Sequence, residues 1–230
     1  MTAAAWGGAR VSVVVPALNE AGNIAALAQE TLAQGVREVV VVDNGSTDDT
    51  AAQAEAAGAR VVREPRRGYG YACAAGSAAA GGDILVYIDA DFSFLPVEIS
   101  RLVDPIAADV ADLVLGSRPL GGIARGAMPP HQRFGNWLTA ALMRGLYGLQ
   151  VTDLGPYRAI RAELLRSLDM GEMTYGWPTE MMVKAARRGA RVAEAPVSYH
   201  PRRAGRSKVG GTVKGSALAA YHILRVTLRS

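Results

Sequence analysis

Residues 84–91 read Ile-Leu-Val-Tyr-Ile-Asp-Ala-Asp, a short apolar run that ends in two aspartates. A run of this length and composition is typical of a strand that is buried on both faces. Three similar runs rich in valine precede it, at 11–16, 38–42 and 60–63. Because Ala-rich stretches of helical length separate these runs, the sequence predicts an α/β fold in which helices cover a parallel sheet.

The remaining elements follow from periodicity and from glycine and proline positions. The expected helices span 21–34, 47–57, 96–107, 133–147 and 178–188, and the later strands span 112–116, 157–160 and 191–197. The stretch 119–130 is rich in Gly and Pro and is expected to be a mobile loop. Because the chain has 230 residues and no repeat or low-complexity linker, we expect a single domain.

Composition excludes several classes of protein. The single cysteine, Cys73, lies in a run of small residues and cannot form an internal disulfide or a metal-thiolate cluster, so we interpret it as a core residue. No apolar run approaches the roughly 20 residues of a membrane-spanning helix. The apolar stretch 11–18 ends in Asn19-Glu20 and lacks a small-residue cleavage site, which favours a strand over a signal peptide. A reducing, cytoplasmic setting is expected.

Charge is distributed unevenly along the chain. Residues 187–230 carry ten Lys or Arg and one acid, Glu194, which is a charge of +9. The whole chain carries +4, so residues 1–186 carry −5. A basic end on an acidic body indicates anionic partners such as phosphates or acidic lipid head groups.

Polar clusters follow the predicted strands at the points where those strands end. The first strand runs into Asn19-Glu20, the second into Asp43-Asn44-Gly45-Ser46-Thr47-Asp48-Asp49, and the fourth into Asp89-Ala90-Asp91. Parallel α/β sheets bind ligands at the carboxyl ends of their strands. We therefore expect these clusters to share one binding site.

Asp89 and Asp91 lie close enough to repel each other unless a cation neutralises them. Mg²⁺ or Mn²⁺ held by one or two carboxylates keeps coordination positions open for phosphate oxygens. An isolated Asp-x-Asp pattern equally fits a turn. Its position directly after a buried strand favours a metal site that grips a nucleotide diphosphate.

Asp43 is expected to accept hydrogen bonds from a base or ribose at the end of the second strand. The residues that follow it have a structural interpretation: Asn44-Gly45 suits a turn, and Ser46 with Asp49 suits a helix capping box. Asn19 and Glu20 fit either a binding role or a cap on the next helix.

Four motifs in order resemble those of family 2 glycosyltransferases, specifically the dolichol-phosphate (polyprenyl-phosphate) mannose synthase group. They are Val14-Val15-Pro16-Ala17-Leu18-Asn19-Glu20, Val42-Asp43-Asn44-Gly45-Ser46-Thr47-Asp48, Asp89-Ala90-Asp91 and Gly205-Arg206-Ser207-Lys208. The resemblance covers about residues 11–214. It implies a GT-A fold, with a Rossmann-like, mostly parallel sheet flanked by helices, and an inverting transfer of mannose or glucose from a GDP- or UDP-sugar to a polyprenyl phosphate.

The resemblance also implies a division of the chain and a role for each matching residue. Residues 11–118 would bind the nucleotide sugar, 119–211 would bind the acceptor, and 212–230 would form a C-terminal amphipathic helix. The nucleoside site would contain Pro16, Asn19, Glu20 and Asp43. The metal and donor-diphosphate site would contain Asp89, Asp91 and Ser93. The basic groups at the phosphates would be Arg118, Arg202 and Lys208, with Ser207 beside them.

The acceptor determines whether a catalytic base is needed. A phosphate monoester is already anionic and needs none, whereas a hydroxyl acceptor needs a carboxylate such as Asp153 or Glu180. Asp153 matches an acidic residue of the family's acceptor region. Either side chain equally fits a cap or an ion pair, so a soluble hydroxyl acceptor remains an alternative. A nucleotidyltransferase and a non-catalytic nucleotide-binding module are further alternatives from other classes.

The chain ends in a stretch whose apolar residues share one helical face. They are Val213, Ala217, Ala220, Leu224 and Leu228. Such a helix either lies on an anionic membrane surface or packs on its own domain. We expect a peripheral membrane contact or a membrane partner subunit at the inner face of the membrane. Nucleic acid is not expected, because no aromatic residues alternate with the basic ones to stack bases.

Overall fold

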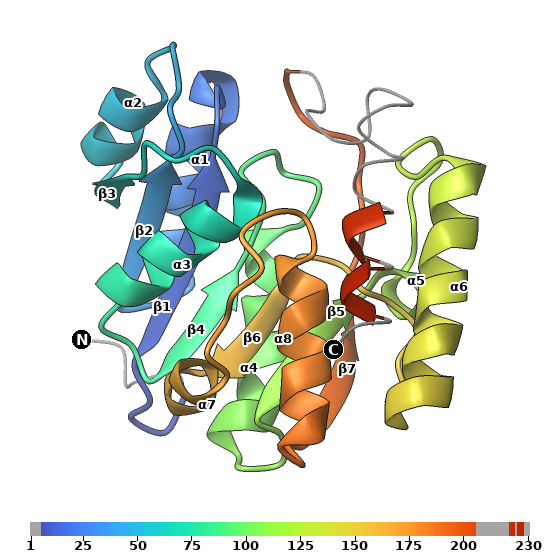
Figure 1. The fold of residues 1–230 in the computed structure, drawn as a ribbon. Coiled ribbons are helices and arrows are strands. Elements are labelled where there is room, and N and C mark those ends of the chain that lie inside the picture. Colours follow the sequence, from blue (N-terminus) through green and yellow to red (C-terminus); the bar gives the residue numbers. More distant parts are fainter. Residues whose placement is uncertain (1–5, 206–220, 224, 228–230) are drawn as a thin grey trace.

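One seven-stranded sheet organises the chain, with strand order β3-β2-β1-β4-β6-β5-β7 (Figure 1). The computed structural model describes residues 6–205, 221–223 and 225–227. The strands are β1 (Val11–Ala17), β2 (Glu38–Asp43), β3 (Arg60–Arg63), β4 (Ile84–Tyr87), β5 (Leu113–Ser117), β6 (Arg158–Arg161) and β7 (Val192–Pro196). The helices are α1 (Ala21–Leu32), α2 (Thr50–Ala56), α3 (Tyr69–Ala79), α4 (Ile99–Ala107), α5 (Arg118–Gly121), α6 (Pro130–Tyr147), α7 (Ala162–Ser167) and α8 (Trp177–Arg187), with the 3-10 turn η1 (Pro96–Glu98) before α4.

The sheet is mostly parallel, as the sequence predicts. β1 pairs in parallel with β2 and β4, β2 pairs in parallel with β3, and β5 pairs in parallel with β7. One strand is the exception, because β6 runs antiparallel between β4 and β5. The carboxyl ends of β1, β2 and β4 therefore lie at the same end of the sheet. Because β6 is antiparallel to β4, it begins at this end.

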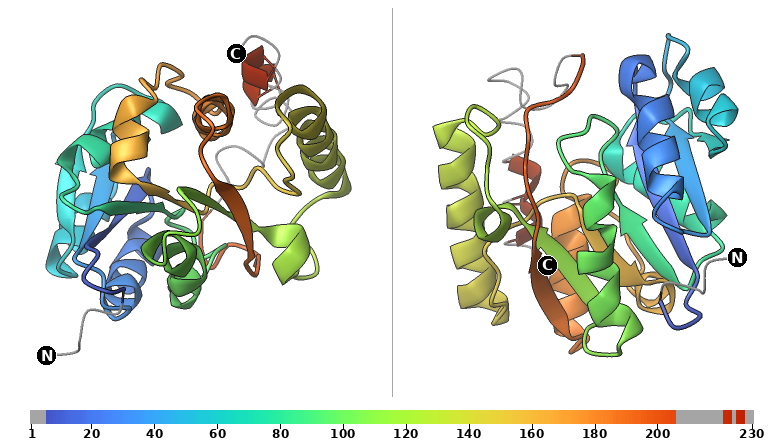
Figure 2. Two further views of the ribbon diagram at one scale, coloured as in Figure 1. Left: turned by 90° about the horizontal axis from the view of Figure 1, so that it is seen from below. Right: turned by 180° about the vertical axis from the view of Figure 1, so that it is seen from behind.

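Alternation along the strands divides the core into two layers. Val13 and Val15 of β1 face the side covered by α1 and α4, whereas Val14 faces the side covered by α3 and α8. The two further views show helices on both faces of the sheet (Figure 2). Because both faces are covered, β1, β2 and β4 are almost entirely apolar and buried. These strands are therefore easy to recognise in the sequence as short apolar runs.

The helix α3 was not assigned from the sequence, although its Ala-rich composition suits a helix. Its contact face is made of glycine and small residues rather than large apolar ones. A Cβ atom added at Gly76 would overlap Cγ1 of Val14 and lie 2.8 Å from Cγ2 of Val42. The absence of a side chain at this position therefore lets α3 lie close against β1 and β2.

Four local predictions need correction. The helix expected over 47–57 begins only at Thr50, and Ser46 and Asp49 do not form a capping box. Instead Oδ1 of Asp48 accepts hydrogen bonds from the backbone N–H and the hydroxyl of Thr50. The Ser46 hydroxyl accepts a hydrogen bond from the backbone N–H of Asn19, which follows β1. The stretch 119–130 begins with the short helix α5, and α6 starts three residues earlier than expected because Pro130 suits a first helical turn.

The C-terminal segment 212–230 lies largely outside the described residues. Residues 221–223 and 225–227 are helical, and Val226 and Thr227 are buried. The Tyr147 hydroxyl at the end of α6 donates a hydrogen bond of 2.6 Å to the carbonyl of Thr227. These residues pack on their own domain. Among the described residues, no helix has the length and apolar character needed to cross a membrane.

Candidate active site

The turn after β4 carries the two aspartates. Asp91 is buried, and its Oδ1 accepts a hydrogen bond of 2.9 Å from the backbone N–H of Ser93. Phe92, between Asp91 and Ser93, has a φ of 60°, a left-handed conformation that costs free energy for an aromatic residue. Two backbone bonds from the segment after β7 hold this turn, from His200 N–H to the Ser93 carbonyl and from Arg203 N–H to the Asp91 carbonyl. The strained turn is thus fixed from outside.

Arg202 joins three distant parts of the chain at this turn. Its Nη1 lies 2.6 Å from Oδ2 of Asp91, and its Nη2 lies 2.5 Å from Oε1 of Glu20, directly before α1. The structure therefore brings together the predicted residues Glu20, Asp91 and Arg202. In this geometry Arg202 acts as the counter-ion of two acids, one of which was expected to bind a metal.

Asp89 lies beside this cluster in an environment that disfavours its charged form. Burial raises the pKa of the Asp89 carboxyl to about 7, and the neighbouring Asp91 charge adds to the increase, while Arg118 and Arg202 oppose it. Two acids in this relation favour a hard cation between them. Among the described residues, no group of three or more His, Cys, Asp or Glu side chains is arranged to hold a metal. Ser93, whose backbone N–H contacts Asp91, is also buried beside the pair.

Hydrogen bonds join the loop after β1 to the loop after β2, and they involve residues that are expected to bind the nucleoside. Asn19 has a φ of 52°, a conformation that asparagine tolerates, and its Oδ1 accepts a hydrogen bond of 2.8 Å from Thr47 N–H. The Ser46 hydroxyl accepts from Asn19 N–H at 2.9 Å, and Oδ1 of Asp43 accepts from Ser46 N–H at 2.9 Å. Asn19 and Asp43 therefore lie at the carboxyl ends of the neighbouring strands β1 and β2, and Ser46 forms hydrogen bonds with both.

Pro16, the remaining nucleoside-site candidate, lies one residue before the end of β1 and pairs with Val42. Asn44 has a structural role that the sequence did not reveal. Its amide donates to the carbonyls of Glu64 and Arg66 and accepts from the N–H of Gly68, which joins β2 to the start of α3. Gly45 has a φ of 83°, which agrees with the predicted turn.

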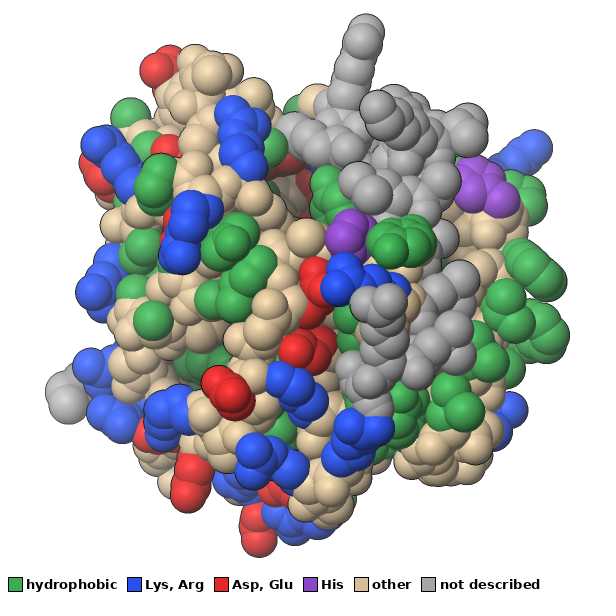
Figure 3. All heavy atoms as spheres, in the orientation of Figure 1, with side chains coloured by type: hydrophobic (Ala, Val, Ile, Leu, Met, Phe, Trp, Pro, Cys, Tyr) green, Lys and Arg blue, Asp and Glu red, His purple; other side chains and the backbone are tan. Residues whose placement is uncertain are grey.

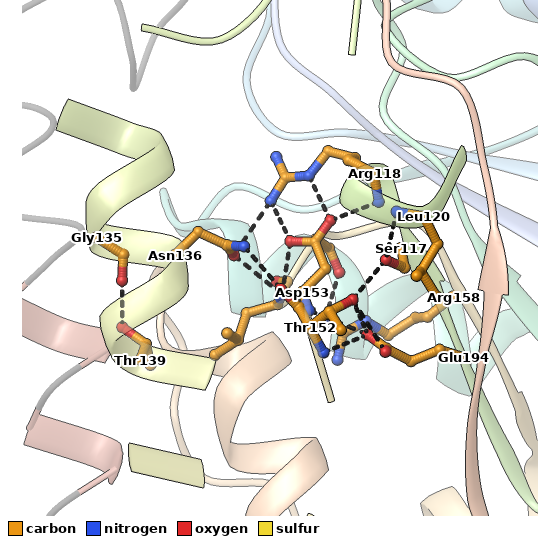
Figure 4. A network of polar contacts seen from close by, with 12 residues as sticks. Ser117, Arg118, Leu120, Gly135, Asn136, Thr139, Thr152, Asp153, Arg158 and Glu194 are labelled. Atoms are coloured by element: carbon orange, nitrogen blue, oxygen red, sulfur yellow. Dashed lines mark hydrogen bonds and ion pairs between the residues drawn. The ribbon is translucent and has the colours of Figure 1, made fainter. Parts of the chain in front are cut away.

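Arg118, at the start of α5, and Asp153 form a buried ion pair (Figure 4). Nε and Nη2 of Arg118 lie 2.7 and 2.6 Å from the two carboxylate oxygens of Asp153, and the Arg118 backbone N–H donates to the same carboxylate. Leu154 N–H donates a fourth hydrogen bond. Burial alone would lower the pKa of Arg118, but the Asp153 carboxylate outweighs burial and raises it. Both oxygens of Asp153 are committed to these donors.

Glu194 of β7 and Arg158 of β6 hold the turn that contains Asp153, and neither was predicted. Glu194 accepts hydrogen bonds from the backbone N–H groups of Thr152 and Asp153 at 2.8 and 3.0 Å. Arg158 is fully buried and donates to the carbonyls of Leu154 and Gly155. An acid and an arginine inside short strands are the sequence signal that identifies such residues, because a strand interior seldom holds charges without a buried partner.

Glu180, the alternative base, is engaged in a different loop. Its carboxylate accepts hydrogen bonds from the N–H groups of Gly171 and Glu172 and lies 2.9 Å from Nζ of Lys184. These contacts fasten α8 to the preceding loop. Ser207 and Lys208, expected at the phosphates, lie outside the described residues.

A cavity of about 490 Å³ opens between α5 and α6, next to the Arg118 pair. Arg118 and Thr152 line it on one side, and Arg133, Trp137 and Arg144 line it along α6. The cavity therefore combines guanidinium groups with apolar side chains. Such a lining suits a molecule that has an anionic group and an apolar part.

The family model described as Glycosyl transferase family 2 matches residues 12–169. An uncharacterized glycosyltransferase of Mycobacterium tuberculosis is 41% identical over 95% of this chain and 98% of its own length. An undecaprenyl-phosphate mannosyltransferase of Micrococcus luteus is 34% identical over 91% of each chain.

Solved structures agree with the fold. Glucosyl-3-phosphoglycerate synthase from Mycobacterium tuberculosis, in complex with Mn²⁺, UDP-glucose and phosphoglyceric acid, superposes with a TM-score of 0.78 at 28% sequence identity. The similarity covers 96% of this chain and 79% of that one. The single α/β sheet flanked by helices matches such GT-A neighbours, which confirms the expected fold class.

Proposed function

Because the chain belongs to glycosyl transferase family 2 and is therefore a glycosyltransferase, we propose that it moves a hexose, mannose or glucose, from a GDP- or UDP-sugar to a polyprenyl phosphate. The transfer depends on Mg²⁺ or Mn²⁺ and inverts the anomeric centre. The observation that carries the proposal is the cluster of Asp89, Asp91, Glu20 and Arg202 at the carboxyl ends of β1 and β4. The nucleotidyltransferase and binding-only alternatives are set aside by family membership.

The donor binds at the acidic residues that follow β1, β2 and β4. Asp89 and Asp91, with Ser93 beside them, hold the cation, and the nucleoside lies against Pro16, Asn19, Glu20 and Asp43. When bound there, a divalent cation would supply positive charge against the charge that develops on the departing diphosphate. The support is the acid pair after β4 and the neighbouring structure that contains Mn²⁺ and UDP-glucose.

Acceptor chemistry follows from how the carboxylates are used. Asp153 and Glu180 are both occupied by N–H donors and cations, which favours an acceptor that brings its own negative charge. In this reaction an oxygen of the acceptor phosphate attacks the anomeric carbon as the bond to the donor diphosphate breaks. Arg118 and Arg202 stabilise the phosphates electrostatically, together with Ser207 and Lys208. Asp153 then acts as a positioning residue that orients Arg118.

The substrates suggest a place for the reaction. A polyprenyl phosphate resides in a membrane, and a nucleotide sugar is water-soluble, so the protein works in the cytoplasm at the inner face of the membrane. A peripheral membrane contact or a membrane partner subunit would bring it there. The positive charge of residues 187–230 supports contact with an anionic surface.

Transfer to a lipid acceptor tests the proposal. The protein is incubated with Mn²⁺, labelled GDP- and UDP-hexoses, and undecaprenyl or dolichyl phosphate, and both glycolipid and nucleoside diphosphate are measured. We expect product that is lost on adding EDTA and that falls at least about a hundredfold in Asp91→Asn, because the cation supplies several kcal/mol of transition-state stabilisation. Asp104→Asn, an exposed change on α4, is the matched control. Absence of glycolipid with every common donor would refute the acceptor.

A soluble hydroxyl acceptor is the second candidate. The solved neighbour was crystallised with phosphoglyceric acid, which is not a lipid. This candidate requires a base, so Asp153→Asn or Glu180→Gln should abolish transfer while donor binding persists. If both variants keep transfer to soluble acceptors, the base is excluded.

A further inference from the structure

The outer face of α6 exposes large apolar side chains. Phe134 is 63% exposed, Trp137 is 62% exposed and Leu146 is 54% exposed, and Leu138 also reaches solvent. Of the eight exposed large hydrophobic residues among those described, four belong to this helix. Figure 3 shows hydrophobic side chains gathered along the side of the molecule that α6 forms. Single exposed apolar residues are common, whereas a contiguous aromatic group marks a contact surface.

The fold does not require this outer face. α6 packs on the domain through Thr139, Ala140 and Met143, which are buried. Phe134, Trp137 and Leu138 are spaced by three and four residues and so share a different side of the helix. The rings of Phe134 and Trp137 lie next to each other, with centroids 5.8 Å apart. The helix therefore has one apolar face for the domain and another for a partner.

Charge around this face identifies the partner. The stretch 118–152 contains four arginines and no Asp or Glu. Arg125, Arg133 and Arg144 of this stretch are exposed, and His131 is exposed at the start of α6. Aromatic residues flanked by arginine, with no acid to repel phosphate, are typical of helices that lie in the interface of an anionic bilayer.

We propose that α6 docks the protein on an anionic lipid surface, with Phe134, Trp137 and Leu138 inserted at the boundary between head groups and acyl chains. The C-terminal segment was the expected membrane contact, but its described residues Val226 and Thr227 are buried on the domain. The docking surface of α6 also borders the 490 Å³ cavity, because Trp137 belongs to both. Docking thus brings the cavity, which Arg118 lines, to the level of the lipid head groups.

The three tryptophans allow a direct measurement. Trp137 is 62% exposed, whereas Trp6 and Trp177 are 7% and 1% exposed. Insertion of α6 should therefore shift the emission of the full-length protein to shorter wavelength when vesicles of phosphatidylglycerol and phosphatidylcholine are added. Trp137→Phe should abolish the shift while the protein still co-sediments with the vesicles. Vesicles of phosphatidylcholine alone should bind at least tenfold more weakly, because the arginines lose their charge partner.

A matched pair of variants tests the surface itself. Phe134→Ser with Leu138→Ser should weaken co-sedimentation at least tenfold without changing thermal unfolding, since both side chains are exposed. Val97→Ser with Val110→Ser removes two exposed apolar residues elsewhere and should bind vesicles like the wild type. Equal vesicle binding by the α6 variant would overturn the proposal. So would a dimer in vesicle-free solution that the α6 variant dissociates, because the face would then be a protein interface.

This proposal rests on the proposed function only for why docking is useful. Vesicle binding is measured without donor, cation or acceptor. A protein that binds vesicles but makes no glycolipid from any donor would leave docking intact and refute the lipid acceptor. A protein that glycosylates a detergent-solubilised acceptor but ignores vesicles would do the reverse.

Discussion

Arg202 is the positive charge at the centre of the candidate site. Its guanidinium neutralises Asp91 and Glu20, two of the residues assigned to the metal and the donor. A divalent ion that binds Asp91 must therefore displace this contact. Under the proposed function, Arg202 released in this way would face the phosphates of the donor.

Replacing Arg202 separates these two roles. In Arg202→Met the carboxylates lose their internal counter-ion, and we expect nucleotide-free Mn²⁺ binding to become about three- to tenfold tighter, since a partly exposed ion pair contributes about 1 kcal/mol. The transfer rate should fall. Isothermal titration calorimetry measures the first quantity and product formation the second. Arg203→Met, an exposed neighbour that does not touch Asp91 through its side chain, should leave Mn²⁺ affinity unchanged. Weaker Mn²⁺ binding in Arg202→Met would contradict this account.

The sequence identified single residues better than it identified their partners. Asp89 and Asp91 follow β4, and Asn19 and Asp43 lie at the carboxyl ends of the neighbouring strands, as the sequence predicts. The contact of Asp153 with Arg118 joins positions 35 residues apart, on either side of α6, and depends on how β5 and the following loops return to the sheet. No local pattern contains that information. The same holds for Glu194, whose partners lie 41 and 42 residues away.

At the scale of elements, strands with two buried faces were the most predictable. β1, β2 and β4 are uniformly apolar, so their boundaries agree with the expected ones within one residue. α3 was missed because its packing relies on the absence of side chains, which produces no apolar stripe. α5 and α7 have four and six residues and are too short to show helical periodicity.

A pair of glycine substitutions tests whether close packing positions α3. Gly76→Ala places a methyl group against Val14 and Val42 and should destabilise the protein by about 1–3 kcal/mol, despite the higher helix propensity of alanine. Gly145→Ala in α6 meets no atom within 4 Å and should be neutral or stabilising by up to about 1 kcal/mol. Urea unfolding measures both. Equal stability of the two variants would mean that α3 moves away from the sheet at little cost.

At the scale of the whole molecule, an ion-pair cluster joins β5, β6 and β7 at the sheet edge opposite the site. Asp112, directly before β5, accepts hydrogen bonds from Arg191 at 2.7 to 3.0 Å and from Arg161 at 3.0 Å. Hydrogen bonds from Arg191 hold the pKa of Asp112 well below its usual range. A depressed folded-state pKa contributes stability above the unfolded-state pKa of about 3.9, and the contribution is lost as pH falls toward the folded-state value.

Acid should therefore erase the difference between the wild type and Asp112→Asn. At pH 7 the variant should be less stable by on the order of 1 kcal/mol, because the arginines lose a partly buried partner. The difference should shrink progressively below about pH 4. Urea unfolding at pH 7, 5, 4 and 3 measures it, with Asp104→Asn as an exposed control. A difference that stays constant across this range would assign the effect to packing rather than to charge.

The antiparallel strand β6 limits how this chain can be divided. Residues 158–161 come from the half assigned to the acceptor, yet they fill the gap between β4 and β5, which both belong to the half assigned to the donor. Without β6, the strand that leads to Asp89 would have an unpaired edge. The two halves are therefore not interchangeable modules: a chimaera joined near residue 118 must supply its own β6. The segments outside the sheet, from α5 through α6 to the residue before Tyr157, can change in length or sequence without removing a strand from this pairing.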